Sequence, residues 1–189
     1  EFLQRHAVSF FGMLVESARH LTNLQVRVES KEYSELRPIA SQEFQDAENV
    51  LVGLLHVLRF DADRHFVKMG YQVDRDNTRG ANFDYWGHRF LGGFQYTLPW
   101  WDVKLSYDYS LHYRDYLFRH SRFPESQPGT RERSDHEQSH AARIELPLPN
   151  NFRLAGDYLA TISRSNLAPF SYEREVFTLS VLRFRKSLD

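Results

Sequence analysis

The sequence has no cysteine among its 189 residues, which excludes disulfide bonds and thiolate metal ligands. Neither sign of charge is in excess, since 24 Lys and Arg residues face 25 Asp and Glu residues, so no nucleic-acid partner is expected. No apolar run reaches the roughly 18 residues of a transmembrane helix. The first residues carry neither an initiator Met nor a cleavable signal pattern, so we expect a mature protein or a piece of a longer one.

Aromatic residues are abundant instead. They make up 15% of a chain whose mean hydropathy is −0.58 and in which 26% of the residues are charged. A chain that is hydrophilic on average but rich in Tyr and Phe is unusual for a compact soluble core. The combination favours a sheet with one polar face and one aromatic face.

Residues 101–115, with the sequence WDVKLSYDYSLHYRD, alternate between apolar and polar side chains. Alternation with period two predicts a β-strand that has one apolar and one polar face. The apolar face comprises Trp101, Val103, Leu105, Tyr107, Tyr109, Leu111 and Tyr113. The polar face comprises Asp102, Lys104, Ser106, Asp108, Ser110, His112 and Arg114.

The same alternation recurs along the chain, for example in residues 65–73, 86–98 and 152–164. Its recurrence predicts an all-β, antiparallel fold. We expect residues 1–189 to form a single β-barrel domain or the C-terminal part of a larger barrel. The predicted strands lie near 6–16, 23–30, 46–60, 65–74, 83–97, 101–114, 139–148, 151–164 and 172–184.

Short and long connections alternate between these strands, which predicts up-and-down topology with short turns at one end and long loops at the other. Transmembrane β-barrels of bacterial outer membranes have this asymmetry and an even number of strands. Nine strands therefore suggest a missed strand or a missing N-terminal part, and we expect an incomplete barrel. The short connections are near 17–22, 61–64, 97–100 and 148–151, and the long ones near 31–45, 74–82, 115–138 and 163–173.

A soluble β-sandwich or lipocalin-like barrel is the alternative fold, because its strands also alternate. Its strands are shorter, about 5–6 residues, whereas a tilted membrane-spanning strand needs about 9–11. The apolar face here is also rich in Tyr, Trp and Phe near the strand ends, as in interfacial aromatic girdles. We therefore favour the transmembrane barrel.

In a membrane barrel, the apolar face of residues 101–113 faces lipid, and the polar face lines an aqueous lumen. We expect Arg143, Glu145, Arg153 and Asp157 to line the lumen as well. This face carries both signs of charge, so it favours no strong ion selectivity. The expected partners are outer-membrane lipid and a further protein chain that completes or accompanies the barrel.

The chain resembles the barrels of Gram-negative outer-membrane proteins that follow tetratricopeptide repeats, such as surface lipoprotein assembly modifiers and exopolysaccharide-export proteins. The resemblance covers roughly residues 60–184, and Phe184 stands where similar barrels end in an aromatic residue that the assembly machinery reads. This chain departs by adding residues 185–189 and by showing no helical repeat. The similar stretches are NTRGANFDYWGHRFLGGFQYTLPW, WDVKLSYDYSLHYRDY and SNLAPFSYEREVFTLSVLRF.

No pattern of residues predicts catalysis, a metal or a cofactor. The nine histidines form no ligand motif, although His136 and His140 lie near the edge of the longest loop. The segment 74–80, DRDNTRG, lacks the glycine spacing and bidentate Glu of a calcium loop. Ser163 occupies the place of the histidine in the His-x-Ser-Asn arrangement of outer-membrane lipases, so we predict that the protein is not an enzyme.

The charged segment 114–140 is either a solvated external loop or a loop that folds inward or contacts a partner. Two functions follow from the predicted architecture. The first is a porin-like conduit for transport or secretion of a polymer, a polypeptide or solutes. The second is a structural barrel that anchors or sheathes a partner assembly in the outer membrane.

Overall fold

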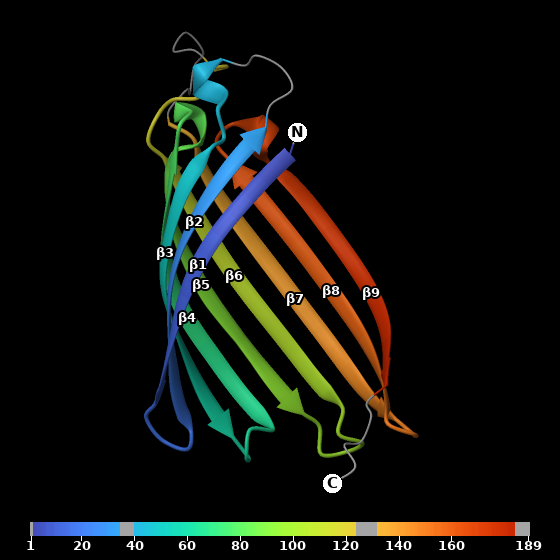
Figure 1. The fold of residues 1–189 in the computed structure, drawn as a ribbon. Coiled ribbons are helices and arrows are strands. Elements are labelled where there is room, and N and C mark those ends of the chain that lie inside the picture. The colour runs from blue at the N-terminus through green and yellow to red at the C-terminus, as the bar shows by residue number, and fades with distance from the viewer. Residues whose placement is uncertain (1, 35–39, 124–131, 184–189) are drawn as a thin grey trace.

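The structure, a computed structural model, describes residues 2–34, 40–123 and 132–183. It confirms the all-β, up-and-down antiparallel fold and the nine predicted strands (Figure 1). The strands are β1 (Phe2–Val15), β2 (His20–Ser34), β3 (Ala47–Phe60), β4 (His65–Thr78), β5 (Tyr85–Thr97), β6 (Lys104–Tyr116), β7 (Ser134–Leu148), β8 (Phe152–Ser165) and β9 (Tyr172–Arg183).

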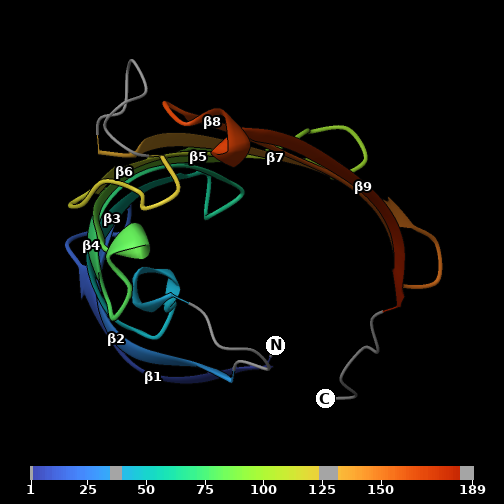
Figure 2. The same cartoon turned by 90° about the horizontal axis from the view of Figure 1, so that it is seen from above.

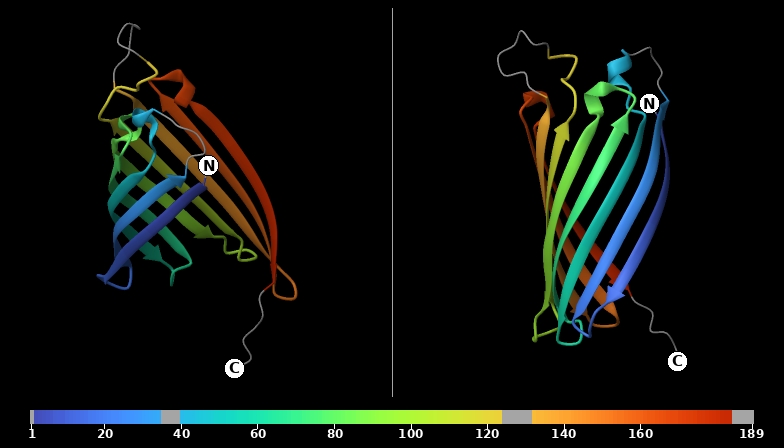
Figure 3. Two further views of the ribbon diagram at one scale, coloured as in Figure 1. Left: turned by 45° about the horizontal axis from the view of Figure 1, so that its top comes forward. Right: turned by 90° about the vertical axis from the view of Figure 1, so that its left-hand side faces the viewer.

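Each strand pairs with the next along the chain, so the sheet has the order β1 to β9. The sheet curls most of the way around a ring and leaves a gap between the edge strands β1 and β9 (Figure 2). The strands are inclined to the axis of this ring, and β9 stands apart from β1 (Figure 3). Among the described residues these two strands do not pair, so the sheet is open, as expected for an incomplete barrel.

One end of the sheet, the turn end, carries the connections 16–19, 61–64, 98–103 and 149–151. The other end, the loop end, carries 35–46, 79–84, 117–133 and 166–171, which include the 3-10 helices η1 (Ser41–Glu43), η2 (Ala81–Phe83) and η3 (Ala168–Phe170). The predicted difference in length therefore holds for the loop-end connections 35–46 and 117–133. The other two, 79–84 and 166–171, are no longer than the longest turn-end connection, because their flanking strands continue into them.

The predicted start of β6 was wrong. The strand begins at Lys104, and the preceding residues Trp101 and Asp102 form a turn with φ angles of 62° and 49°. Left-handed backbone does not fit a pleated strand, so these two residues belong to neither face of the sheet. Val103, which precedes the strand, is buried with 5% of its surface exposed.

The two faces of the curled sheet are distinguished by side-chain contacts between strands that are not neighbours. Lys31 of β2 binds Asp76 of β4, and Lys68 of β4 binds Asp108 of β6. Side chains two strands apart can meet only on the side toward which the sheet curves. These residues therefore define the concave face, and alternate residues in each strand define the convex face.

The convex face is apolar along most of its height. It exposes large apolar side chains, including Phe10 at 68%, Phe177 at 74% and Leu179 at 75%. Charged residues occur on this face of the described strands only near the strand ends. They are Glu32, Glu48, Arg75, Asp115, Arg164, Glu173 and Glu175 toward the loop end, and Arg183 at the turn end.

Candidate functional site: the polar concave face

The concave face carries most of the charged side chains of the described strands. The strand register places ten of the eleven residues predicted to line a lumen on this face, and the exception is Asp102 of the turn. Whether the face lines a lumen stays a prediction. The ten residues are Lys104, Ser106, Asp108, Ser110, His112, Arg114, Arg143, Glu145, Arg153 and Asp157.

The concave face also contains charged residues that the prediction did not name. Asp74 and Asp76 were predicted to lie in a polar loop, but β4 continues to Thr78 and carries both carboxylates onto this face. Their alternation with Arg75 and Asn77 could not reveal the strand, because both faces are polar there. The other unnamed residues are Arg5, Arg27, Glu29, Lys31, Arg59, Lys68, Arg89, Asp135, Glu137 and Arg174.

A buried histidine links β4, β5 and β6 on the concave face. Nε2 of His112 lies 3.0 Å from Oδ1 of Asp74, and Nη2 of Arg89 lies 3.0 Å from its Nδ1. A guanidinium can only donate, so Nδ1 accepts from Arg89 and Nε2–H donates to Asp74. Gly87 lies beneath this bridge, and a Cβ there would stand 2.6 Å from His112 Nε2. The glycine is therefore needed for the two side chains to meet across β5.

A second bridge crosses β5 nearer the turn end. Nζ of Lys68 lies 2.5 Å from Oδ1 of Asp108, and Gly93 of β5 lies between their strands. A Cβ at Gly93 would stand 2.8 Å from both Lys68 Cε and the backbone oxygen of Tyr107. Because the glycine has no side chain, the ion pair can lie flat against the wall.

Asp135 of β7 is the most buried carboxylate of the concave face, with 0% exposed. It accepts hydrogen bonds from Arg133 Nη2 at 2.6 Å and from the Tyr116 hydroxyl at 3.2 Å. Arg114 lies 3.9 Å away and binds Glu137 at 2.9 Å. Each charge in this group has a partner of opposite sign, as burial requires.

Two further groups extend the pattern to β2 and β8. Toward the loop end, Asp76 accepts from Lys31 at 3.0 Å and from Asn49 at 3.3 Å. Toward the turn end, Arg143 binds Glu145 at 2.8 Å and Asp157 at 3.1 Å. The ion pairs described above join residues of one strand, of adjacent strands or of strands two apart, except that Arg133 lies in the connection just before β7. These pairs therefore neutralise their charges along the wall.

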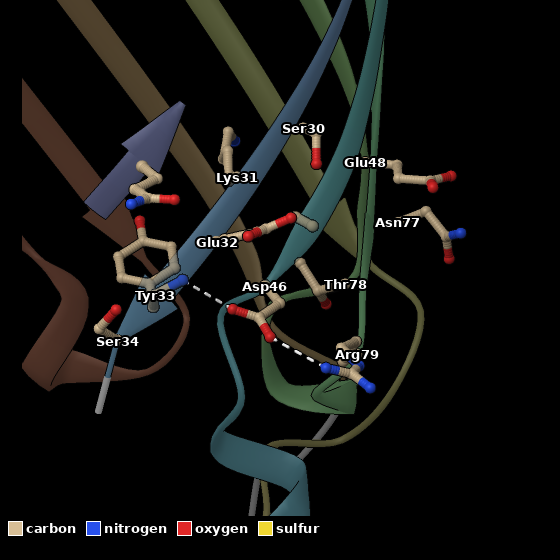
Figure 4. A pocket seen from close by; sticks show the side chains of 12 residues that line it. Ser30, Lys31, Glu32, Tyr33, Ser34, Asp46, Glu48, Asn77, Thr78 and Arg79 are labelled. Atoms are coloured by element: carbon tan, nitrogen blue, oxygen red, sulfur yellow. Dashed lines mark hydrogen bonds and ion pairs between the residues drawn. The ribbon is translucent and has the colours of Figure 1, made fainter. Parts of the chain in front are cut away.

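A pocket of about 740 Å³ lies at the loop end of β1 to β4. Figure 4 shows Asp46 between two donors, the backbone N–H of Tyr33 at 2.7 Å and Arg79 Nη1 at 3.2 Å. The rest of the lining is mostly hydroxyl, amide and carboxylate groups, including Glu32 and Glu48. Its polarity fits a part of the sheet that stands in water.

The described residues give no support for catalysis at Ser163 or for a metal site. Ser163 is 1% exposed, and its hydroxyl has no hydrogen-bond partner, so no base is in place to activate it. No group of three or more His, Asp or Glu side chains in the described chain could hold a metal ion. His140 contacts Tyr107 at 2.8 Å on the convex face.

The described chain has no helix that is both long and apolar enough to cross a membrane. Comparisons with models of protein families, with curated proteins and with solved structures found no match to this chain. The sheet is compatible with a β-barrel, and nothing in these comparisons supports a more specific resemblance.

Proposed function

We propose that the chain belongs to a β-barrel in the outer membrane of a Gram-negative bacterium, and that the barrel is a passive, non-catalytic conduit. The observation that carries the proposal is the separation of charge between the two faces. On the described strands the convex face has charged residues only near the strand ends, whereas ion pairs cover the concave face from β1 to β8. A barrel that spans a bilayer needs this arrangement, with lipid outside and water inside.

The length of the strands supports a membrane location. Each has 12 to 15 residues, which exceeds the roughly 9–11 that a tilted strand needs to cross the hydrocarbon core. Exposed apolar side chains as extensive as Phe10, Phe177 and Leu179 are a liability in water and are stable in lipid. Trp100 and Trp101, exposed at 70% and 85% in a connection at the turn end, fit an interfacial aromatic girdle.

The direction of the ion pairs favours a conduit over a filled barrel. A barrel stuffed with side chains would pair charges across its interior. Here the bridges over Gly87 and Gly93 lie against the wall rather than across the interior, which supports a water-filled lumen. The conduit would therefore pass polar solutes or a hydrated polymer or polypeptide, as the resemblance to export barrels implies.

Further strands would complete the barrel. Bare edges at β1 and β9 would leave unpaired N–H and C=O groups in lipid, at several kcal/mol each. Since every neighbouring pair is antiparallel, β1 and β9 run in the same direction. An all-antiparallel closure thus requires an odd number of additional strands, which makes the total even. The partner is accordingly a protein segment with an odd number of strands that alternate between apolar and polar residues.

The second candidate is a barrel that anchors or sheathes a partner assembly. The loop end favours it, because η1 and η2 lie inside the outline of the ring (Figure 2) and so cover part of its opening. A covered opening suits an anchor better than a free conduit.

Conductance separates the two candidates. The complete barrel, inserted into planar lipid bilayers, is expected to conduct both ions of KCl with little selectivity, because the concave face carries both charges. Insertion without measurable conductance at any pH would reject the conduit and leave the anchor. Failure to insert into lipid at all would reject both.

A further inference from the structure

A strap of residues 117–123, which follows β6, connects the loops of the loop end to one another. Its first residue donates from its backbone N–H to the backbone oxygen of Asp84, at 3.0 Å. Asn82 of η2, only 1% exposed, donates to the Ser121 hydroxyl at 2.9 Å and accepts from the Ser121 N–H at 2.8 Å. Arg122 Nε lies 2.5 Å from Oε1 of Glu43 in η1. The strap therefore holds both η1 and η2.

His120 is the centre of the strap and is buried, with 6% exposed. Its ring lies 5.1 Å from Phe170 of η3, 5.5 Å from Phe123 and 6.4 Å from Phe83 of η2, measured between ring centroids. The cluster thus joins the strap to η2 and η3. Three aromatic rings form an apolar environment that suits a neutral imidazole and opposes a charged one.

The hydrogen bonding of His120 also requires a neutral ring. The backbone N–H of Arg122 donates to Nδ1 of His120 at 3.3 Å, so Nδ1 carries no proton. Protonation of Nδ1 would remove this acceptor and place two donors against each other. The imidazole thus closes the turn of the strap only while it is neutral.

Most charged groups around His120 disfavour its protonated form. Arg133 stacks 3.5 Å from the Phe170 ring centroid, and Arg122 is in the strap itself. Glu43 of η1 opposes them, but it binds Arg122, just as Asp135 binds Arg133. η2 and η3 contribute only aromatic and polar uncharged side chains to the contacts with the strap.

We propose that the strap 117–123 is an acid-sensitive latch, in which neutral His120 holds η1 and η2 over the opening of the barrel and protonated His120 releases them. The proposal rests on the proposed conduit and names a regulation of it. Release would uncover the part of the opening that η1 and η2 overlie in Figure 2. At neutral pH the latch is closed, and in acid the conduit is open.

The sign of the pH dependence follows from proton binding. Burial lowers the pKa of His120 from its ordinary value of 6.5, Arg133 and Arg122 lower it further, and Glu43 raises it. The docked strap therefore binds fewer protons than the released strap. Above pH 6.5 docking of the strap has its full stability. As the pH falls from 6.5 toward the lower pKa of the docked state, the ratio of docked to released strap falls by at most about tenfold per pH unit.

Hydrogen exchange of the strap at pH 7.5 and 5.0, corrected for intrinsic rates, tests the latch in the complete barrel in lipid. We expect protection of the backbone amides of residues 117–123 to fall several-fold at pH 5.0. The variant His120→Phe keeps the aromatic packing but has neither the Nδ1 acceptor nor a titrating ring, so protection of its strap should be the same at both pH values. The control His88→Phe removes a histidine that contacts Tyr71 far from the strap, and it should behave like the natural protein.

An equal acid response in His120→Phe, or unchanged protection in the natural protein, would overturn the latch. If His120→Phe does not fold, an NMR titration of His120 in the natural protein replaces it, and a pKa at or above 6.5 would contradict the latch. Conductance separates this proposal from the conduit. Acid-dependent exchange with no conductance at either pH would reject the conduit and keep the strap release.

Discussion

The same strands form the convex and concave faces of this sheet, but the two faces differ in polarity and in charge. The convex face exposes Phe, Leu, Val and Tyr, and its few charges lie near the strand ends. The concave face pairs Lys and Arg with Asp and Glu over most of its height. The difference shows that residue parity within a strand, rather than overall composition, determines the polarity of each face.

The largest expected effect is on the concave face, at Asp135. The substitution Asp135→Asn leaves Arg133 buried without its charge partner, so we expect a loss of about 3–5 kcal/mol in the free energy of unfolding. The control Glu173→Gln removes a carboxylate that pairs with Arg164 in an exposed position, and it should cost below about 1 kcal/mol. Urea unfolding in lipid vesicles measures both, and equal losses would show that burial does not distinguish the two pairs.

A charge moved from one face to the other tests the comparison directly. Leu111→Arg places a cation on the convex face near the middle of β6 and should cost about 2–4 kcal/mol if that face meets the bilayer midplane. Ser110→Arg adds the same side chain to the concave face one residue earlier and should be tolerated far better. Folding yields into vesicles compare the two, and similar yields would refute the assignment of the faces.

The adjacent glycines Gly92 and Gly93 form a matched pair on opposite faces of β5. A Cβ at Gly93 would crowd Lys68 and the backbone of Tyr107, so we expect Gly93→Ala to cost about 1–3 kcal/mol. A Cβ at Gly92 meets nothing within 4 Å, so Gly92→Ala should be close to neutral. Thermal unfolding of the two variants provides the comparison. A neutral Gly93→Ala would mean that the bridge between Lys68 and Asp108 does not need the glycine.

The prediction with the smallest effect on the protein concerns the side of the membrane on which the loop end and the turn end lie. We expect protease added to intact cells to cut within the predicted external segment 119–138, ahead of the start of β7 at Ser134; part of this segment lies outside the described residues. The turn-end connections 98–103 and 149–151 should be protected, because they would face the periplasm. Cleavage at those turns with protection of 119–138 would reverse the topology.

Sequence alternation predicted the number of strands, their order and most of the concave face, because one apolar and one polar face leave a period of two. It was less accurate at the strand ends. β7 begins at Ser134 rather than near 139, and β4 continues through Asp76, because both faces are polar there and the alternation disappears. The strap around His120 was not predictable, because its contacts join loops that are far apart in the sequence.

The most direct test of the account is a scan of lipid contact along β6. Single cysteines at residues 104–113, each carrying a spin label, report access to oxygen in lipid and to a nickel chelate in water. The account predicts alternation with period two, in which Leu105, Tyr107, Tyr109, Leu111 and Tyr113 contact lipid and the intervening residues contact water. Uniform access along the strand, or the opposite parity, would contradict a membrane barrel with a polar interior.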